Sequence, residues 1–256
     1  MLEKIKQLGI VPVIKIDNAE KAIPLAKALC RGGLPCAEIT FRTDKAEESI
    51  KRISAALPDM IVGAGTILTP LQADKAVAAG AKFVVSPGFN PRVVAHCVDK
   101  GIPIFPGCSN PSDIEQALEF GLKCVKFFPA EQAGGIAAIK AMAAPYGNLS
   151  FLPTGGINAK NLNDYLSFER VIACGGSWMV DATLIDAGDF AAIEKLTHTA
   201  VHTMLGFELG HVGINAPNET EAEKTAKTFG DIFGFEYKDG SSSIFLGPYI
   251  EVMKTP

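Results

Sequence analysis

The chain has 256 residues, 48% of them hydrophobic, which suffices for one large domain or for a large domain and a small one. Its net charge of −4 and the absence of any run of about 18 apolar residues argue against a nucleic-acid partner and a membrane-spanning helix. Because the N-terminus lacks the apolar region of a secretory signal and the six cysteines form neither a CxxC pair nor a disulfide-rich pattern, we expect a cytoplasmic protein.

Charge divides the chain into two parts. Residues 1–206 carry 20 acidic and 20 basic side chains, whereas residues 207–256 carry eight acidic and four basic ones. The entire negative excess therefore lies in the C-terminal segment, whose composition sets it apart. We expect two domains, residues 1–205 and residues 206–256.

Short apolar runs that end in turn or polar residues recur along the first part, separated by stretches with helical spacing. Strands that alternate with helices predict parallel βαβ units, and eight such units predict an α/β fold of the (β/α)8 TIM-barrel type. An open doubly wound sheet is the alternative, but no GxGxxG sequence follows the first run. The runs are VPVIKI (11–16), CAEITF (36–41), IVGAGT (61–66), FVVSPG (83–88), IPIFPG (102–107), CVKFFP (124–129), FLPTGG (151–156) and VIACGG (171–176).

Lys15 lies near the end of the first run and is one candidate nucleophile. Asn18 follows it as the expected N-cap residue of a helix. This helix start is expected to direct the Lys15 side chain toward solvent, so Lys15 ranks behind the lysine of the sixth run.

The second run has a polar and an apolar face. Because side chains alternate along a strand, Glu38, Thr40 and Arg42 share one face. Ile39 and Phe41 share the other face and are expected to pack on helices, which directs the polar face into the barrel. A carboxylate and a guanidinium are costly to bury unless they are paired or used in chemistry. Because about 13 Å of strand separates them, an ion pair is disfavoured and we predict a catalytic role for Glu38.

Lys126 lies in the middle of the sixth run, among apolar and aromatic residues. A buried strand is normally continuously hydrophobic, so a cation there needs a reason. Burial disfavours the ammonium form and leaves a free amine that can attack a carbonyl carbon. A lysine whose head reaches solvent from a strand end is the structural alternative. Together with Glu38, the pattern favours a lysine that forms a Schiff base.

Several runs end in glycine beside a hydroxyl side chain. Thr66 follows Gly65, and Thr154 precedes Gly155 and Gly156. Gly175, Gly176 and Ser177 form a similar group at the eighth run. Paired glycines expose backbone N–H groups to an anion, and the loops after strands seven and eight of such barrels commonly bind phosphate. Ordinary turn glycines are the alternative.

Residues 1–205 resemble the 2-keto-3-deoxy-6-phosphogluconate / 4-hydroxy-2-oxoglutarate aldolase family over essentially all eight units. The resemblance rests on seven segments, which are specific only in combination. These are VPVI (11–14), AEITFRT (37–43), VGAGT (62–66), SPG (86–88), VKFFPAE (125–131), PTGG (153–156) and GGSW (175–178).

The resemblance implies a class I aldolase, a carbon–carbon lyase that needs no cofactor, in which Lys126 forms the imine and Glu38 is the general acid and base. It further implies that Arg42 and Thr66 hold the pyruvate carboxylate. Pro87 and Phe128 are implied to contact substrate, with Thr154 lining the pocket. The glycines of the last two loops (Gly155, Gly156, Gly175, Gly176) and Ser177 are implied to receive the phosphate.

The implied substrate is 2-keto-3-deoxy-6-phosphogluconate, cleaved to pyruvate and glyceraldehyde 3-phosphate as in the Entner–Doudoroff pathway. The family also implies cleavage of 4-hydroxy-2-oxoglutarate to pyruvate and glyoxylate, and a homotrimer. The galactonate epimer is an alternative substrate that the residues leave open. A phosphate-sugar isomerase and a barrel scaffold with a ligand-sensing tail are alternatives of other classes.

The C-terminal segment begins anew after a helix-like stretch at 190–206. Residues 208–216 are expected to form a strand, residues 219–235 a helix and residues 241–254 further strands. This order resembles one βαβββ module of the glyoxalase/vicinal-oxygen-chelate superfamily, in which His211 and Glu251 match metal-ligand positions. Because a complete site in that superfamily needs two modules, we expect tails that pair between protomers or pack on the barrel, with metal ligation the less favoured role.

Overall fold

The computed structural model describes residues 1–207 and 210–254. The chain forms two compact units, Met1–Leu205 and Gly206–Pro256. Each has its own hydrophobic core. Within the described residues, no helix combines the length and the apolar character that crossing a membrane requires.

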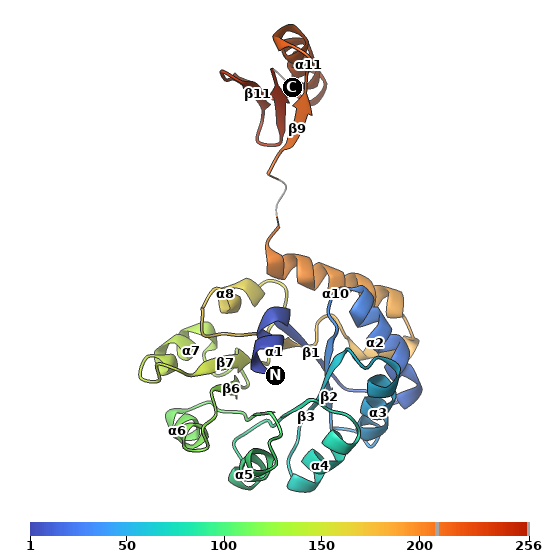
Figure 1. Cartoon of the computed structure of the whole chain (residues 1–256), viewed down its shortest axis with the longest axis vertical. Coiled ribbons are helices and arrows are strands. Elements are labelled where there is room, and N and C mark those ends of the chain that lie inside the picture. The colour runs from blue at the N-terminus through green and yellow to red at the C-terminus, as the bar shows by residue number, and fades with distance from the viewer. Residues whose placement is uncertain (208–209, 255–256) are drawn as a thin grey trace. The chain divides into compact units, whose positions relative to one another are not determined.

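The first unit is a closed barrel of parallel strands surrounded by helices (Figure 1). One ladder runs in the order β5-β4-β3-β2-β1-β8, and β6 pairs with β7. Parallel bridges between Gly107 and Lys126 and between Thr154 and Gly175 join the two ladders, which closes the cylinder. The predicted (β/α)8 barrel is thereby confirmed. Its strands are β1 (Ile10–Ile14), β2 (Cys36–Thr40), β3 (Ile61–Gly65), β4 (Phe83–Val85), β5 (Ile104–Phe105), β6 (Cys124–Phe127), β7 (Ser150–Pro153) and β8 (Cys174–Gly176).

Most strands end before the predicted runs do. The run at 83–88 contributes only Phe83–Val85 as strand, and the run at 124–129 ends as strand at Phe127. The residues left over are mostly glycine, proline, serine and threonine, which turn the chain at the carboxyl end of the barrel. The sequence pattern therefore merges each strand with the loop that carries its polar groups.

The helices begin where short polar side chains can cap them. Three consecutive helices start with the same device, a Thr or Asn cap followed by proline: Thr69 for α4, Asn90 for α5 and Asn110 for α6. Proline at the first helical position loses no hydrogen bond, and the cap side chain satisfies a free N–H group. The helices of this unit are α1 (Leu2–Leu8), α2 (Ala22–Arg31, preceded by the 3-10 turn Ala19–Lys21), α3 (Ala46–Ala56), α4 (Pro70–Ala78), α5 (Pro91–Asp99), α6 (Pro111–Glu119), α7 (Gly135–Ala143), α8 (Leu162–Leu166), α9 (Ala182–Ala187) and α10 (Phe190–Leu205).

The side chains inside the barrel change in character from one end to the other. The layer near the amino ends of the strands is apolar and includes Cys36 and Cys124, with Ile5 of α1 packed into the same cluster. Because side chains alternate along a strand, Glu38 and Lys126 lie one layer nearer the carboxyl ends. The helix α1 thus contributes to the apolar core beneath the polar layer, and the carboxyl end is left for a site.

The second unit is a four-stranded sheet covered by one helix. Its sheet order is β10-β11-β12-β9, with β12 and β9 parallel and the other pairs antiparallel. The βαβββ order is therefore confirmed, although residues 208–209 of the predicted first strand lie outside the described residues. The elements are β9 (Val212–Asn215), α11 (Glu219–Phe233), β10 (Tyr237–Asp239), β11 (Ser243–Leu246) and β12 (Ile250–Met253).

A buried lysine, Lys254, forms ion pairs with two exposed carboxylates and so links the helix to the sheet. The Lys254 ammonium lies 2.9 Å from Glu219 of α11 and 2.8 Å from Asp239 of β10. Its two carboxylate partners raise the pKa of Lys254. Apolar side chains of α11 and the sheet, among them Ala222, form the core beside it.

Candidate active site

Lys126 and Glu38 meet inside the barrel. The Lys126 Nζ atom lies 3.6 Å from Glu38 Oε1, and the two side chains are 7% and 1% exposed. Strands β6 and β2, far apart in sequence, supply them from the same interior layer. The structure therefore brings the two predicted catalytic residues together in the polar layer above the apolar core.

The Glu38 carboxylate lies in the barrel interior beside Lys126. Both of its oxygens are buried and form no hydrogen bond within the described part of the chain. Gly65 of the neighbouring strand makes room for it, because a methyl group added at Gly65 would overlap Glu38 Oε1. A buried carboxylate without partners is unfavourable unless a ligand or a reacting group supplies them. Its free oxygens can therefore accept a proton from substrate or from water.

Arg42 and Thr66 lie together at the mouth of the barrel. The Arg42 Nε group donates to Thr66 Oγ1 at 3.4 Å. Thr66 has a φ of 58°, and among the described residues it is the one non-glycine residue with a positive φ. Strained backbone of this kind persists where the surrounding structure holds it and gathers at functional sites. The pair that the family resemblance assigns to a carboxylate is therefore assembled in the structure.

A cavity of about 300 Å³ opens at the carboxyl end of the strands. It is bordered by Arg42 from the β2 loop and by Phe128 from the β6 loop. The Phe128 ring centroid lies 5.1 Å from Lys126 Nζ, which connects the cavity to the buried pair. The predicted phosphate-loop residues that line it are Thr154, Gly155, Gly156, Gly175, Gly176 and Ser177.

The glycine loops are held close to the loop after β6. Glu131 N donates to Gly155 O at 3.1 Å, and Ala130 N donates to Thr154 O at 2.9 Å. Gly155 and Gly156 have φ values of 103° and 80°, a backbone region that side chains strongly disfavour. The Thr154 Oγ1 atom is buried and has no hydrogen-bond partner in the described residues, although Thr154 lines the cavity. These loops therefore offer hydrogen-bonding groups to a ligand.

Pro87 occupies a different place. It lines a separate hollow of about 260 Å³ together with Ser86, Gly88 and Phe89. Its carbonyl oxygen lies against Gly107, where a side chain would overlap it. The structure thus assigns Pro87 to a neighbouring loop rather than to the lining of the main cavity, and its substrate contact stays a prediction.

Two charged residues of the cavity were not predicted from the sequence as site residues. Lys15 was expected to lean toward solvent; it is half exposed but also lines the cavity, and so does Asp181. Hydrogen bonds from Thr183 lower the pKa of the Asp181 carboxyl, which caps helix α9. For Lys15 the alternation along residues 11–16 was the available signal, because Val13 and Lys15 are two positions apart and share one face of an extended segment.

His211 and Glu251 of the second unit also meet. The His211 Nε2 atom lies 2.9 Å from Glu251 Oε2, and Ser243 Oγ donates to Glu251 Oε1 at 2.7 Å. Within residues 1–207 and 210–254, no group of three or more His, Cys, Asp or Glu side chains has metal-binding geometry. The two predicted ligands are adjacent, and their metal role stays a prediction.

Comparison with known proteins identifies the family to which the barrel belongs. The family model "KDPG and KHG aldolase" matches residues 1–196. The 2-dehydro-3-deoxy-phosphogluconate aldolase of Treponema pallidum is 52% identical over 197 residues, covering 77% of this chain and 94% of that protein. The KHG/KDPG aldolase of Escherichia coli K12 is 43% identical over 192 residues, covering 75% of this chain and 90% of that protein.

Solved structures agree with the sequence relatives. The KDPG aldolase of Legionella pneumophila, whose crystal structure holds pyruvate as a covalent carbinolamine intermediate, matches with a TM-score of 0.76 and 37% identity. The match covers 78% of this chain and 98% of that one. The second unit lies beyond the residues that the family model matches.

Proposed function

This chain belongs to the KDPG and KHG aldolase family, and from that premise we propose that it cleaves 2-keto-3-deoxy-6-phosphogluconate to pyruvate and glyceraldehyde 3-phosphate. It is a class I aldolase, a carbon–carbon lyase that works through a lysine imine. We propose 4-hydroxy-2-oxoglutarate, cleaved to pyruvate and glyoxylate, as a second substrate. Their shared 2-keto acid end is the part that Lys126 attacks.

The reaction begins at the substrate C2 carbon. The neutral Lys126 amine attacks C2 and forms a carbinolamine. Glu38, whose nearer oxygen lies 3.6 Å from Nζ, transfers the protons that allow the C2 oxygen to leave as water. The product is a protonated imine on Nζ, and its positive charge withdraws electrons from C3.

Cleavage follows from that charge. Glu38 takes the proton of the C4 hydroxyl, which lets the C3–C4 bond break, and the bond's electron pair moves into the imine to give an enamine. The C4 fragment leaves as the aldehyde. Glu38 then supplies a proton to C3, and hydrolysis of the imine releases pyruvate and the free amine. The imine is the electron sink, so the chemistry needs no metal.

Binding groups lie at both ends of the substrate. We assign the pyruvate carboxylate to Arg42 and Thr66, because a guanidinium and a hydroxyl held together suit a carboxylate. We assign the phosphate to the loops of Gly155 and Gly156 and of Gly175, Gly176 and Ser177. Thr154 and Phe128 lie between these ends on the cavity wall, with Pro87 in the neighbouring loop.

The observation that carries the proposal is the buried pair of Lys126 and Glu38, a glutamate whose oxygens accept no hydrogen bond from the residues that the structure describes. Borohydride reduction in the presence of pyruvate tests it directly, because reduction of the imine leaves a stable adduct that mass spectrometry locates. We expect the adduct on Lys126 and none in Lys126→Ala. An adduct on another lysine, or none in the wild type, would overturn the assignment.

Substrate identity needs a separate test. Coupled pyruvate detection with 2-keto-3-deoxy-6-phosphogluconate, its galactonate epimer and 4-hydroxy-2-oxoglutarate distinguishes the three. We expect the highest kcat/KM for the first. A higher value for the epimer would reassign the substrate, and release of no pyruvate from any of them would favour the isomerase or scaffold alternatives.

The remaining proposals concern assembly and the second unit. The barrel forms a homotrimer in the cytoplasm, as the family resemblance implies. The second unit is a single glyoxalase-like module that pairs with its counterpart on another protomer. His211 and Glu251 supply only two of the four ligands that zinc usually takes, so we favour an interaction role over a metal site. Size measurement of the full chain and of a chain ending at Leu205 tests the pairing. Metal analysis of wild type and His211→Ala tests the metal role.

A further inference from the structure

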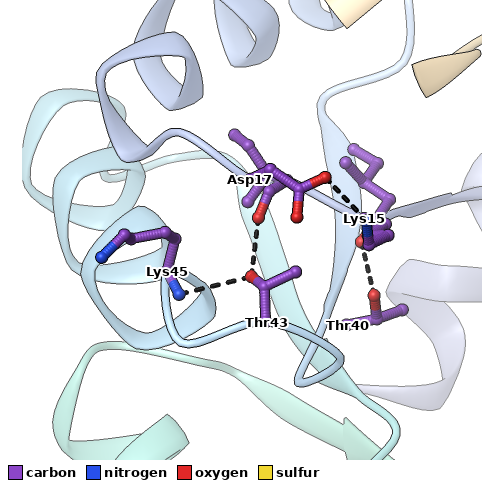
Figure 2. Close-up of polar contacts among 7 residues, drawn as sticks. Lys15, Asp17, Thr40, Thr43 and Lys45 are labelled. Atoms are coloured by element: carbon purple, nitrogen blue, oxygen red, sulfur yellow. Dashed lines mark hydrogen bonds and ion pairs between the residues drawn. The ribbon is translucent and has the colours of Figure 1, made fainter. Parts of the chain in front are cut away.

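Lys15 is placed to meet the distal end of the substrate. Its flanking residues Ile14 and Ile16 are fully buried, whereas Val13 and Lys15 line the cavity. Thr40 Oγ1 donates to Ile14 O at 2.9 Å and Thr43 Oγ1 donates to Ile16 O at 2.7 Å, as Figure 2 shows. The backbone on both sides of Lys15 is thereby fixed, and its side chain projects from a rigid base.

The strand beside Lys15 carries one of the glycine loops. In the β1–β8 ladder Val11 pairs with Gly175 and Pro12 with Gly176. Lys15 follows three residues after Pro12 toward the mouth of the barrel. Lys15 therefore lies between the Arg42 loop of β2 and the glycine loop of β8, and all of them line one cavity.

The charged residues that line the cavity suggest a role for Lys15 in binding an anion. Its charged lining residues are Lys15, Arg42 and Asp181. Thr183 donates two hydrogen bonds to the Asp181 carboxylate, at 2.8 Å and 2.5 Å, which stabilises its ionised form. A phosphate of charge about −2 near that carboxylate would be repelled. With Arg42 committed to the substrate carboxylate, Lys15 is the remaining cation of the lining.

In the free protein Lys15 is paired loosely. Its Nζ atom lies 2.7 Å from Asp17 Oδ2, and both side chains are about half exposed. A half-exposed ion pair between flexible side chains contributes little free energy. A phosphate dianion is a stronger partner for an ammonium group and can compete with Asp17 for it.

We infer that Lys15 is a specificity-determining residue that binds the phosphate of the substrate, moving from Asp17 to the phosphate when substrate enters. This inference rests on the proposed function. It gives the chain a charge contact with the phosphate in addition to the neutral N–H groups of the glycine loops, and it leaves the chemistry at Lys126 untouched.

Lys45 provides a matched control. It is paired with the adjacent Asp44 at 2.9 Å, and its side chain is 47% exposed, against 48% for Lys15. It does not line the cavity, and in Figure 2 it lies on the other side of Thr43 from Lys15. Lys45→Ala removes the same charge from the same end of the barrel.

The test compares the full chain with Lys15→Ala, Lys15→Arg and Lys45→Ala. For Lys15→Ala we expect a KM for 2-keto-3-deoxy-6-phosphogluconate about 3- to 30-fold higher, from the loss of one charge-assisted contact, with kcat within about twofold. The pyruvate concentration that gives half-maximal borohydride trapping on Lys126 should not change. Lys15→Arg should restore most of the KM, and Lys45→Ala should match the wild type.

An unchanged KM in Lys15→Ala, an equal rise in Lys45→Ala, or a parallel shift of pyruvate trapping would overturn the inference. Titration of inorganic phosphate into each variant separates this failure from failure of the proposed function. If no substrate yields pyruvate but Lys15→Ala still weakens phosphate binding, only the function fails. If pyruvate is released and Lys15→Ala binds phosphate as tightly as the wild type, only the inference fails.

Discussion

Each unit of the molecule places a basic side chain beside a glutamate, but the two pairs differ in burial. In the barrel, Lys126 and Glu38 are 3.6 Å apart and are 7% and 1% exposed. In the second unit, His211 and Glu251 are closer, at 2.9 Å, and are 47% and 18% exposed.

The partners of the two glutamates also differ. Glu251 accepts a further hydrogen bond from Ser243, whereas both oxygens of Glu38 are buried without hydrogen bonds in the described part of the chain. Ser243 and His211 each contact one oxygen of the Glu251 carboxylate, so a ligand or an added proton would stabilise it little. The buried Glu38 carboxylate is stabilised when a substrate or a proton binds to it. The pair in the barrel therefore differs from the pair in the second unit by the burial of a carboxylate that lacks hydrogen bonds in the described residues, and not by a shorter distance between its charged groups.

Removing the proposed nucleophile, Lys126, should have the largest effect. In Lys126→Ala we expect kcat for pyruvate release to fall by at least about four orders of magnitude, because the amine beside Glu38 that forms the imine is lost. Steady-state kinetics and borohydride trapping measure it. Circular dichroism should show an intact fold, and residual activity above about 1% would contradict the role.

Glu38→Gln should have the next largest effect. The amide keeps the volume of the side chain but cannot exchange protons, so we expect kcat to fall by about 10²- to 10⁴-fold. Because the side-chain volume is kept, circular dichroism should show an intact fold. His211→Ala, from the pair in the second unit, is the control and should keep full activity. Equal losses of kcat in both variants would contradict the difference between the two pairs.

The buried thiols of the barrel should be unreactive. Burial raises the pKa of Cys97 to about 11 from 9.0, which lowers its thiolate fraction near neutral pH by about 100-fold. Cys30 is only partly buried. We expect iodoacetamide at pH 8 to modify Cys30 first in the native protein, as peptide mass mapping would show.

The raised pKa of Cys97 makes the free energy of unfolding depend on pH. Because the folded pKa of Cys97 lies above the unfolded value, the unfolded state loses its proton first as pH rises. Its contribution to the free energy of unfolding should therefore decrease between about pH 9 and pH 11. Alkaline melting curves of wild type and Cys97→Ala should converge in that range; parallel curves would contradict it.

Gly65→Ala should damage the buried pair indirectly. The added methyl group overlaps Glu38 Oε1, so the carboxylate must shift from its position beside Lys126. Overpacking of this kind costs about 1–3 kcal/mol of stability. We expect a roughly tenfold lower kcat and a lower melting temperature. Gly88→Ala, where a methyl group meets open space, is the control.

Changes in the second unit should have the smallest effect on catalysis. Lys254→Met removes the ion pairs to Glu219 and Asp239, so we expect residues 206–256 to exchange amide hydrogens faster. Pyruvate release should stay within about twofold of wild type, since the catalytic pair belongs to the barrel. A large loss of kcat would show that the two units are coupled.

The local pattern of the sequence predicts the fold and the identity of the central residues. The alternation along β2 indicates that Glu38 and Thr40 face inward while Ile39 faces the helices. A lysine in an otherwise apolar run indicates a special environment at position 126. These features are local because a strand fixes which side chains share a face, whatever the strand pairs with.

Tertiary structure decides which of those side chains meet. Closure of the barrel through Gly107 and Lys126 brings β6 into the same polar layer as β2. Closure also makes Lys15 part of the cavity lining, while its side chain stays half exposed as its local sequence predicts. It separates Pro87 from the other predicted contacts. Sequence spacing along a single strand determines which side of the sheet each side chain faces. Distances between strands arise only when register and closure bring remote segments together.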